Sequence, residues 1–253
     1  MQIEPIPAFN DNYIWLLDDG VAAWVVDPGD AEPVLARLAS RSLSLAGILV
    51  THHHPDHVGG LQKLVEKTGC RVLGPKNPSI KQISETFAEG DTADLLGCRF
   101  KVLAVPGHTL DHIAWYCESA KALFCGDTLF AGGCGRIFEG DAPMMYASLE
   151  KLAALPADTR VYCAHEYTLA NLDFARTAEP HNSELLARDT HCRLQRQRGE
   201  PTVPSTVGME RATNPFLRPH SSDIVASLRA SGRLQDTSEV GVFAALRAWK
   251  DNF

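Results

Sequence analysis

The sequence predicts an α/β domain over residues 1–165, followed by a small helical domain over residues 166–253. Up to residue 165, short apolar runs of strand length alternate with segments of helical spacing, as is typical of α/β folds. Beyond that point the strand-like runs stop and helical spacing remains. A hydrophobic content of 45% over 253 residues supports a sizeable core.

Short apolar runs, many of them ended by glycine, proline or aspartate, indicate the strands. The first two are joined through Asp18-Asp19-Gly20, which is a hairpin turn signal. Residues 74–94 are polar and contain Pro75 and Pro78, so a loop is expected there. In chain order, the predicted strands are residues 13–17, 22–26, 45–50, 70–73, 100–105, 113–116, 122–125 and 160–164.

Apolar residues three and four positions apart indicate the helices. The segment 144–155, for example, places Met145, Leu149 and Leu152 on one face. Asn182 is suited to cap the helix that follows it, because its side chain can accept from a free backbone N–H. The predicted helices are residues 33–40, 61–68, 144–155, 169–176, 183–197, 222–230 and 240–249.

A dense group of potential metal ligands lies in Thr51-His-His-His-Pro-Asp-His-Val-Gly-Gly60, between a predicted strand and a predicted helix. His52 and His54 are two residues apart, so their rings point to the same side of an extended segment. Asp56 and His57 follow directly and should point elsewhere. Such side chains are buried only when paired or bound to metal. A solvated polar loop is the alternative, but the pattern favours a dinuclear metal site.

Three further side chains of metal-ligand type, His108, Asp127 and His165, each follow a predicted strand. Singly, each is most simply a turn residue. Together with the first four they make seven protein ligands, the number that a dinuclear site with one bridging carboxylate requires.

Composition excludes several classes of function. A net charge of −7 argues against a nucleic-acid or anionic-membrane partner. Seven cysteines without a C-x-x-C motif favour a reducing cytoplasm over a disulfide framework. We expect no signal peptide, because the N-terminus lacks a basic patch and a continuous apolar run. No apolar run approaches the roughly 20 residues of a membrane helix.

The ligand pattern from Thr51 to His57, with the three later residues, resembles the metallo-β-lactamase superfamily. Four further motifs are similar to the hydroxyacylglutathione hydrolase family: Phe9-Asn-Asp-Asn-Tyr13, Gly133-Cys-Gly-Arg136, His165-Glu-Tyr-Thr168 and Asn214-Pro-Phe-Leu-Arg218. The resemblance implies an αββα sandwich for residues 1–165 and a helical, glutathione-binding domain for residues 166–253.

The resemblance also implies roles for particular residues. His52, His54 and His108 would hold one metal ion, Asp56, His57 and His165 the other, and Asp127 would bridge them. Asp56 and Asp127 are the expected catalytic residues, Asp56 because it could also orient the nucleophile. Substrate-binding residues would be Arg136, Phe138, Tyr167, Asn171, Arg218 and Ser221. Phe138 stands where some members have tyrosine, and Ser221 where some have lysine.

The expected activity is hydrolysis of S-(2-hydroxyacyl)glutathione, such as S-D-lactoylglutathione, to glutathione and a 2-hydroxy acid such as D-lactate. A hydroxide bridging two divalent ions would attack the thioester in methylglyoxal detoxification. Zinc is expected, with iron or manganese as alternatives, because imidazole and carboxylate suit all three. The expected protein is a cytoplasmic monomer. The alternative is another dinuclear metallohydrolase of the same fold, either a lactonase or a different thioesterase.

Overall fold

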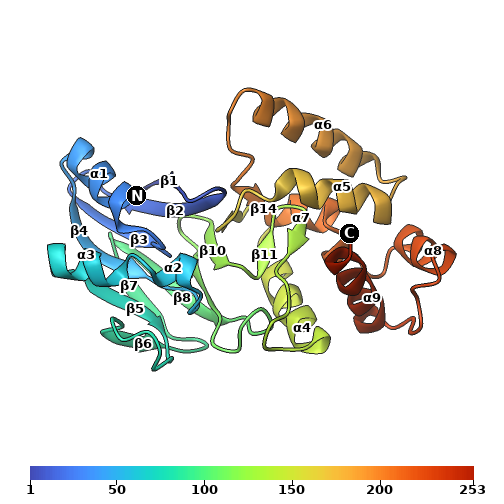
Figure 1. The fold of residues 1–253 in the computed structure, drawn as a ribbon, viewed down its shortest axis with the longest axis horizontal. Helices are drawn as coiled ribbons and strands as arrows, with labels where there is room; N and C mark the ends of the chain where they lie inside the picture. Colours follow the sequence, from blue (N-terminus) through green and yellow to red (C-terminus); the bar gives the residue numbers. More distant parts are fainter. The chain divides into compact units, whose positions relative to one another are not determined.

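The computed structural model describes residues 1–253 and divides into two compact units (Figure 1). Unit 1 comprises Met1–Ala104 and Asp111–Gly126, and unit 2 comprises Val105–Leu110 and Asp127–Phe253. The sequence-based division at residue 165 differs from these units and stays a prediction. None of the helices combines the length and the apolar character needed to cross a membrane.

Unit 1 contains a six-stranded sheet and a second, antiparallel sheet. In the first, β1 to β3 are antiparallel and β3 to β6 are parallel, in the order β1-β2-β3-β4-β5-β6. In the second, β10, β9, β8 and β7 follow one another. The bounds are β1 Gln2–Ala8, β2 Asn12–Asp18, β3 Ala22–Val26, β4 Ser44–Leu49, β5 Arg71–Pro75, β6 Glu85–Phe87, β7 Thr92–Leu95, β8 Cys98–Ala104, β9 Ile113–Cys117 and β10 Ala122–Gly126.

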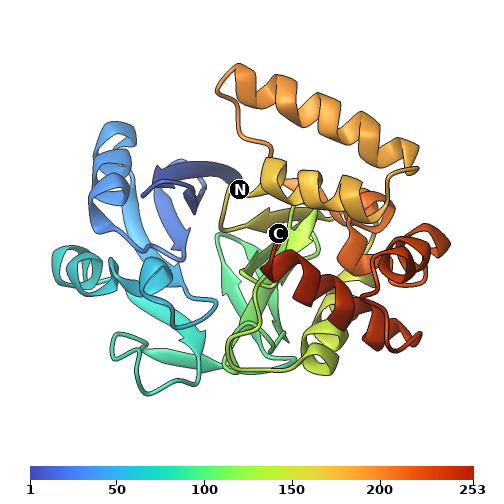
Figure 2. The ribbon, with the colours of Figure 1, turned by 45° about the vertical axis from the view of Figure 1, so that its right-hand side comes forward.

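Helices α1 (Ala31–Arg41) and α3 (Leu61–Thr68) cover one face of the first sheet (Figures 1 and 2). Their apolar stripes supply Val34 and Leu64, both fully buried, to a core shared with the strands. The predicted β2–β3 hairpin and both helices are therefore confirmed. The expected loop over residues 74–94 is only partly right, because β6 and the start of β7 lie within it. β6 is a short edge strand of exposed and half-buried residues, so backbone pairing rather than an apolar pattern defines it. β7 does alternate exposed and buried residues, but it is only 4 residues long.

Unit 2 is mainly helical, with two small antiparallel pairs of strands, β11–β12 and β13–β14. Helices α5 and α6 lie side by side in both views (Figures 1 and 2), and Asn182 caps α6 as predicted. The bounds are β11 Leu129–Phe130, β12 Gly133–Cys134, α4 Ala142–Ala153, β13 Arg160–Cys163, α5 Thr168–Ala178, α6 Ser183–Gln197, β14 Ser205–Thr206, α7 Val207–Thr213, η1 Pro215–Leu217, α8 Ser222–Ala230 and α9 Glu239–Asp251.

Five short elements of unit 2 escaped the sequence-based assignment: β11, β12, β14, α7 and η1. The strands are held by backbone pairing, and α7 and η1 by capping side chains rather than by a long apolar stripe. Thr206 accepts from the backbone N–H of Met209 at the start of α7, and Asn214 accepts from Phe216 at the start of η1. Caps of this kind satisfy N–H groups that the first turn leaves without intrahelical partners.

Candidate active site

Four of the predicted ligands gather at the carboxyl end of β4, all within unit 1. The chain leaves β4 in an extended conformation, and Pro55 then starts the single helical turn α2 (Pro55–Val58). His54, before the proline, has φ −61° and ψ 144°, because proline disfavours the helical region for its predecessor. The ring of His52 consequently lies 4.8 Å from that of His54 and 4.1 Å from that of His57, centroid to centroid.

Asp56 and His57 form a carboxylate–imidazole pair on this turn. Nε2 of His57 lies 3.4 Å from Oδ2 of Asp56. Asn12 donates a hydrogen bond to the same oxygen over 3.0 Å, which fixes how the carboxylate is turned. Asp56 therefore presents its oxygens in a defined direction, although its side chain is 39% exposed.

Asp27, which the sequence analysis treated only as the end of a strand, organises the histidines. Because β3 and β4 are parallel, their carboxyl ends meet, and buried Asp27 lies beside Thr51. Its carboxylate accepts from the backbone N–H of Thr51 (2.8 Å) and from the Thr51 hydroxyl (2.7 Å). The hydroxyl oxygen lies 3.0 Å from Nδ1 of His52, and Asp27 Oδ2 lies 3.1 Å from Nδ1 of His57. A carboxylate behind an imidazole in this way fixes its tautomer and raises its basicity as a metal ligand.

The other three predicted ligands belong to unit 2, where His108 and His165 both face Asp127. Oδ2 of Asp127 lies 3.5 Å from Nε2 of His108, and Oδ1 lies 3.4 Å from Nε2 of His165. All three side chains are at most 10% exposed. Each oxygen of one buried carboxylate thus faces a different imidazole nitrogen, as a carboxylate bridging two ions would.

Backbone and aromatic contacts hold these two imidazoles in place. Nδ1 of His108 lies 2.7 Å from the backbone carbonyl oxygen of Arg136, so Nδ1 carries the proton and Nε2 presents its lone pair toward Asp127. The ring of Tyr167 stacks on that of His165 at 4.7 Å with an interplanar angle of 5°. Phe130 meets His165 edge-on at 5.8 Å.

The donor sets fit divalent metal ions on two grounds. Imidazole nitrogen and carboxylate oxygen are the ligands that zinc, iron and manganese share. In addition, two ligands bound at about 2.1 Å to one tetrahedral ion lie roughly 3.4 Å apart. The nitrogen–oxygen separations at Asp56 and at both oxygens of Asp127 are 3.4, 3.5 and 3.4 Å. These distances match paired ligands better than hydrogen bonds.

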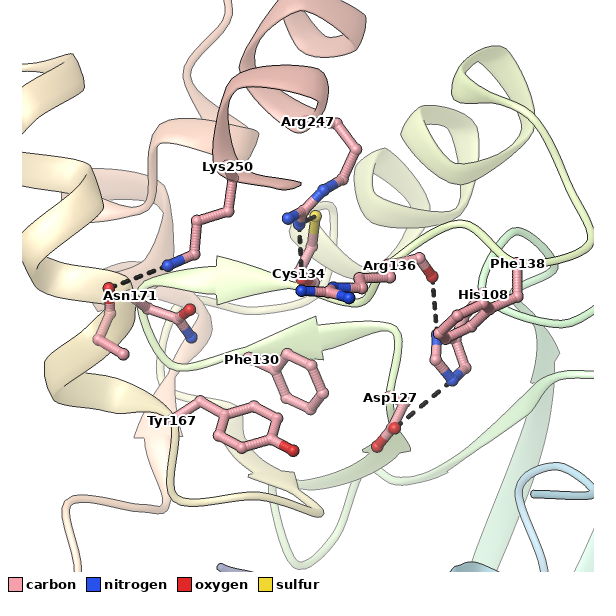
Figure 3. Close-up of a pocket in the computed structure, with 11 residues that line it drawn as sticks. His108, Asp127, Phe130, Cys134, Arg136, Phe138, Tyr167, Asn171, Arg247 and Lys250 are labelled. Atoms are coloured by element: carbon pink, nitrogen blue, oxygen red, sulfur yellow. Dashed lines mark hydrogen bonds and ion pairs between the residues drawn. The ribbon is translucent and has the colours of Figure 1, made fainter. Parts of the chain in front are cut away.

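A pocket of about 380 Å³ opens beside His108 and Asp127 and is built entirely from unit 2 (Figure 3). Four predicted substrate-binding residues line it: Arg136, Phe138, Tyr167 and Asn171. The remaining lining residues were not predicted, and they are Phe130, Cys134, Ala170, Arg247 and Lys250. The last two lie three residues apart on α9, but the predicted helix 240–249 ended one residue before Lys250, so the sequence assignment included only the first of the two cations.

The unpredicted cations give the pocket a positive wall on α9. Burial, and next the charge of nearby Arg247, lower the pKa of the Lys250 ammonium, whose Nζ donates to the backbone carbonyl of Ala170 over 3.1 Å. Arg247 is buried and donates to the carbonyl oxygen of Cys134 over 2.9 Å (Figure 3). Burial raises the pKa of the Cys134 thiol despite that neighbour, so the thiol stays neutral. The pocket therefore favours an anionic ligand.

Arg218 and Ser221, also predicted to bind substrate, do not line this pocket. Arg218 makes two hydrogen bonds to the carboxylate of Glu179, over 2.9 and 2.8 Å. Ser221 donates to the same carboxylate over 2.6 Å. Their part in substrate binding stays a prediction, while their contacts explain how η1 and α8 are tied to the end of α5.

Comparison with known proteins agrees with this description. Residues 9–79 and 74–165 match the metallo-beta-lactamase superfamily, and residues 166–253 match the hydroxyacylglutathione hydrolase C-terminus. Proteins named hydroxyacylglutathione hydrolase from Chromohalobacter salexigens and Ectopseudomonas mendocina are 53% and 50% identical, each match covering 100% of both chains. The crystal structure of TTHA1623 in a di-iron-bound form is 27% identical, with a TM-score of 0.62, over 86% of this chain and 100% of that one.

Fold and donor sets together define a protein with the metallo-beta-lactamase fold and a C-terminal helical domain. The predicted fold class is thereby confirmed. With relatives at about half identity along its whole length, the chain belongs to the hydroxyacylglutathione hydrolase family.

Proposed function

We propose that this protein hydrolyses S-(2-hydroxyacyl)glutathione, with S-D-lactoylglutathione as the representative substrate, to glutathione and a 2-hydroxy acid. The relatives' shared name and the match to their C-terminal domain support this substrate class. The observation that carries the chemistry is Asp127, whose two oxygens face His108 and His165 at 3.5 and 3.4 Å. This reaction would serve the detoxification of methylglyoxal.

We further propose that both donor sets act on one pair of divalent ions. His52, His54 and His108 would hold one ion and Asp56, His57 and His165 the other, with one oxygen of Asp127 on each. When bound, such ions polarise a carbonyl and lower the pKa of water to near 7. Zinc is the proposed metal, and iron or manganese would fit the same donors.

The chain's own residues would orient the reactants. Asp56, whose carboxylate is oriented by a hydrogen bond from Asn12, would accept a proton from the attacking water. The lone pair of the water oxygen would then point at the carbonyl carbon of the thioester. A thiol has a pKa of only about 8.5, so glutathione can leave as a thiolate without a strong acid nearby. No serine or cysteine nucleophile is needed, and the neutral, buried Cys134 is poorly suited to be one.

The pocket of unit 2 would bind the glutathione moiety. Glutathione carries carboxylates, and Arg136, Arg247 and Lys250 supply the positive charge that suits them. Of these, Arg136 is the exposed and adaptable one, while buried Arg247 shapes the wall through the Cys134 carbonyl. Tyr167 and Phe138 would flank the substrate near His165 and His108.

In domain terms, we propose that residues 1–165 carry the catalytic chemistry and residues 166–253 the glutathione-binding helices. The two family models meet at this boundary. We also propose a cytoplasmic monomer. No disulfide joins any of the seven cysteines, which suits a reducing compartment.

A substrate panel tests the proposal. Metal-loaded protein should hydrolyse S-D-lactoylglutathione far faster than a lactoyl thioester of N-acetylcysteamine, which has the same acyl group and lacks glutathione's carboxylates. An acyl-homoserine lactone serves as the third substrate. Faster hydrolysis of the lactone would establish a lactonase instead, and equal rates on both thioesters would establish a thioesterase that does not recognise glutathione.

A further inference from the structure

Unit 2 buries a full ion pair that the proposed chemistry does not use. Glu210 on α7 is fully buried, and Arg188 on α6 is 7% exposed. Nη2 of Arg188 donates to Oε1 of Glu210 over 2.6 Å. Buried ion pairs often stabilise a protein no more than apolar side chains of similar size would. The contacts that Glu210 makes with other segments are therefore of more interest than the contribution of the pair to the stability of the protein.

Both oxygens of Glu210 are fully used as acceptors. Oε1 also accepts from the hydroxyl of Ser205. Oε2 accepts from the backbone N–H of Gly132 over 2.8 Å and from the side-chain amide of Asn214 over 3.0 Å. A carboxylate has about four lone-pair positions, and here each one has a donor. Gly132 lies in the turn of the β11–β12 hairpin, 78 residues away in the chain.

The other polar groups of that turn are also held by side chains from distant segments. Asn214 donates to the carbonyl oxygens of Gly133 (2.9 Å) and Phe130 (3.3 Å). Asn171 donates to the carbonyl oxygen of Ala131 over 3.2 Å. Asn171 also packs closely against the turn, because a Cβ on Gly133 would lie 2.6 Å from its side chain.

This hairpin carries much of the candidate site of unit 2. Phe130 and Cys134, on its two strands, line the pocket (Figure 3). Asp127 precedes β11 by two residues, and Arg136 follows β12 by two. A hairpin tilted by even a small amount would move the carboxylate that faces His108 and His165.

We infer that Glu210 is a positioning residue: through the N–H of Gly132 it fixes the β11–β12 hairpin and thereby the place of Asp127. Glu210 lies neither in the pocket lining nor in a donor set. Its effect on turnover rests on the proposed function, whereas its hold on the hairpin does not. Misplacing a reacting group by about 1 Å can cost roughly a hundredfold in rate.

Glu210→Asp and Glu210→Gln test this role in different ways. The aspartate keeps the charge beside Arg188 but is one methylene too short to reach Gly132. The glutamine keeps the reach but replaces one acceptor oxygen with a donor. Two quantities would be measured on each variant: backbone hydrogen exchange of the peptide spanning residues 128–136, and kcat and KM per folded molecule on S-D-lactoylglutathione. Asp189→Asn is the control, since Asp189 is also buried and ion-paired, with Arg176 over 2.9 Å, away from the hairpin.

Both Glu210 variants should raise exchange in the hairpin peptide and lower kcat by about tenfold or more, with smaller changes in KM. The control should lose thermal stability while its hairpin exchange and kcat stay as in the wild type. If one of the two Glu210 variants fails to fold, the other supplies the same two readouts. Unchanged hairpin exchange, or a kcat no lower than that of the control, would overturn the inference. A wild type that is inactive on the thioester would instead contradict the proposed function. The exchange result alone would then decide whether Glu210 fixes the hairpin.

Discussion

Oδ2 of Asp27 lies 3.1 Å from Nδ1 of His57, behind the ring and away from Asp56. The same carboxylate accepts hydrogen bonds from the backbone N–H and the hydroxyl of Thr51. The hydroxyl oxygen in turn lies 3.0 Å from Nδ1 of His52. One side chain at the end of β3 thereby orients two imidazoles at the end of β4. In both histidines Nδ1 is the ring nitrogen that faces this network, so Nε2 is the atom that the proposed metal site would use.

Replacing Asp27 should consequently weaken metal binding without removing a ligand. We expect Asp27→Asn to lower metal affinity by about ten- to a hundredfold, as is usual when a carboxylate behind a ligating histidine is lost. Zinc titration of metal-free protein against a chelator measures the change. Asp30→Asn is a matched control three residues on, because asparagine caps α1 as well as aspartate does. Equal affinity for both variants would contradict the role given to Asp27.

Asp127→Asn should act on both ions, since each of its oxygens faces a different histidine. An amide offers one neutral oxygen in place of two charged ones, so bound metal should fall below two ions per chain and turnover should nearly disappear. Metal content by mass spectrometry and kcat are the measurements. A variant that keeps two ions and full kcat would show that Asp127 does not bridge.

Lys250→Met should raise KM for S-D-lactoylglutathione by roughly tenfold while changing kcat less, because a hydrogen bond to a charged group contributes about 1.5–3 kcal/mol. Methionine keeps a side chain of similar length, but it removes the ammonium together with the cation–π contact that Nζ makes with the Phe174 ring at 5.4 Å. The N-acetylcysteamine thioester, which lacks the carboxylates, should respond little. Arg218→Ala is the comparison. An unchanged KM for Arg218→Ala would show that Arg218 does not bind the substrate, and an unchanged KM for Lys250→Met would show the same for Lys250.

Stability should fall in acid through Glu179. Burial alone would raise the pKa of this carboxyl, but hydrogen bonds from Arg218, Asn182 and Ser221 outweigh burial and lower it below the usual 4.5. A group with a depressed folded-state pKa contributes stability that is present above the unfolded-state value and is lost as pH falls through the folded-state value.

The free energy of unfolding of the wild type should therefore exceed that of Glu179→Gln by a constant amount near pH 7. That excess should shrink below about pH 4.5. Urea denaturation at several pH values measures it. Glu200→Gln is the control, because Glu200 pairs with Arg198 at the surface, where ion pairs contribute little. An excess that does not change with pH would contradict the assignment to Glu179.

Periodicity and turn chemistry predicted most of this fold, and the reasons for the failures are specific. The helices over residues 61–68, 183–197 and 222–230 agree with α3, α6 and α8 in both bounds, because each pairs a clear apolar stripe with end signals. Strand β6 was missed because its residues are largely exposed and polar. Its pairing with β5 is a tertiary property that a local pattern does not contain.

The candidate site shows the same division. The seven side chains of the two proposed donor sets could be singled out because metal chemistry needs those residue types at those strand ends, and their role as ligands stays a prediction. Asp27 could not be distinguished from an ordinary turn aspartate until the parallel pairing of β3 and β4 was known. Arg247 and Lys250 are two cations on an amphipathic helix, and only the packing of α9 shows that they face a pocket.

Metal titration tests the central claim most directly. Metal-free protein would be loaded stepwise with zinc while hydrolysis of S-D-lactoylglutathione and bound metal are followed in the same samples. We predict that turnover appears with metal and reaches its plateau at two ions per chain. Full activity in metal-free protein, or no hydrolysis of the thioester with two ions bound, would contradict it.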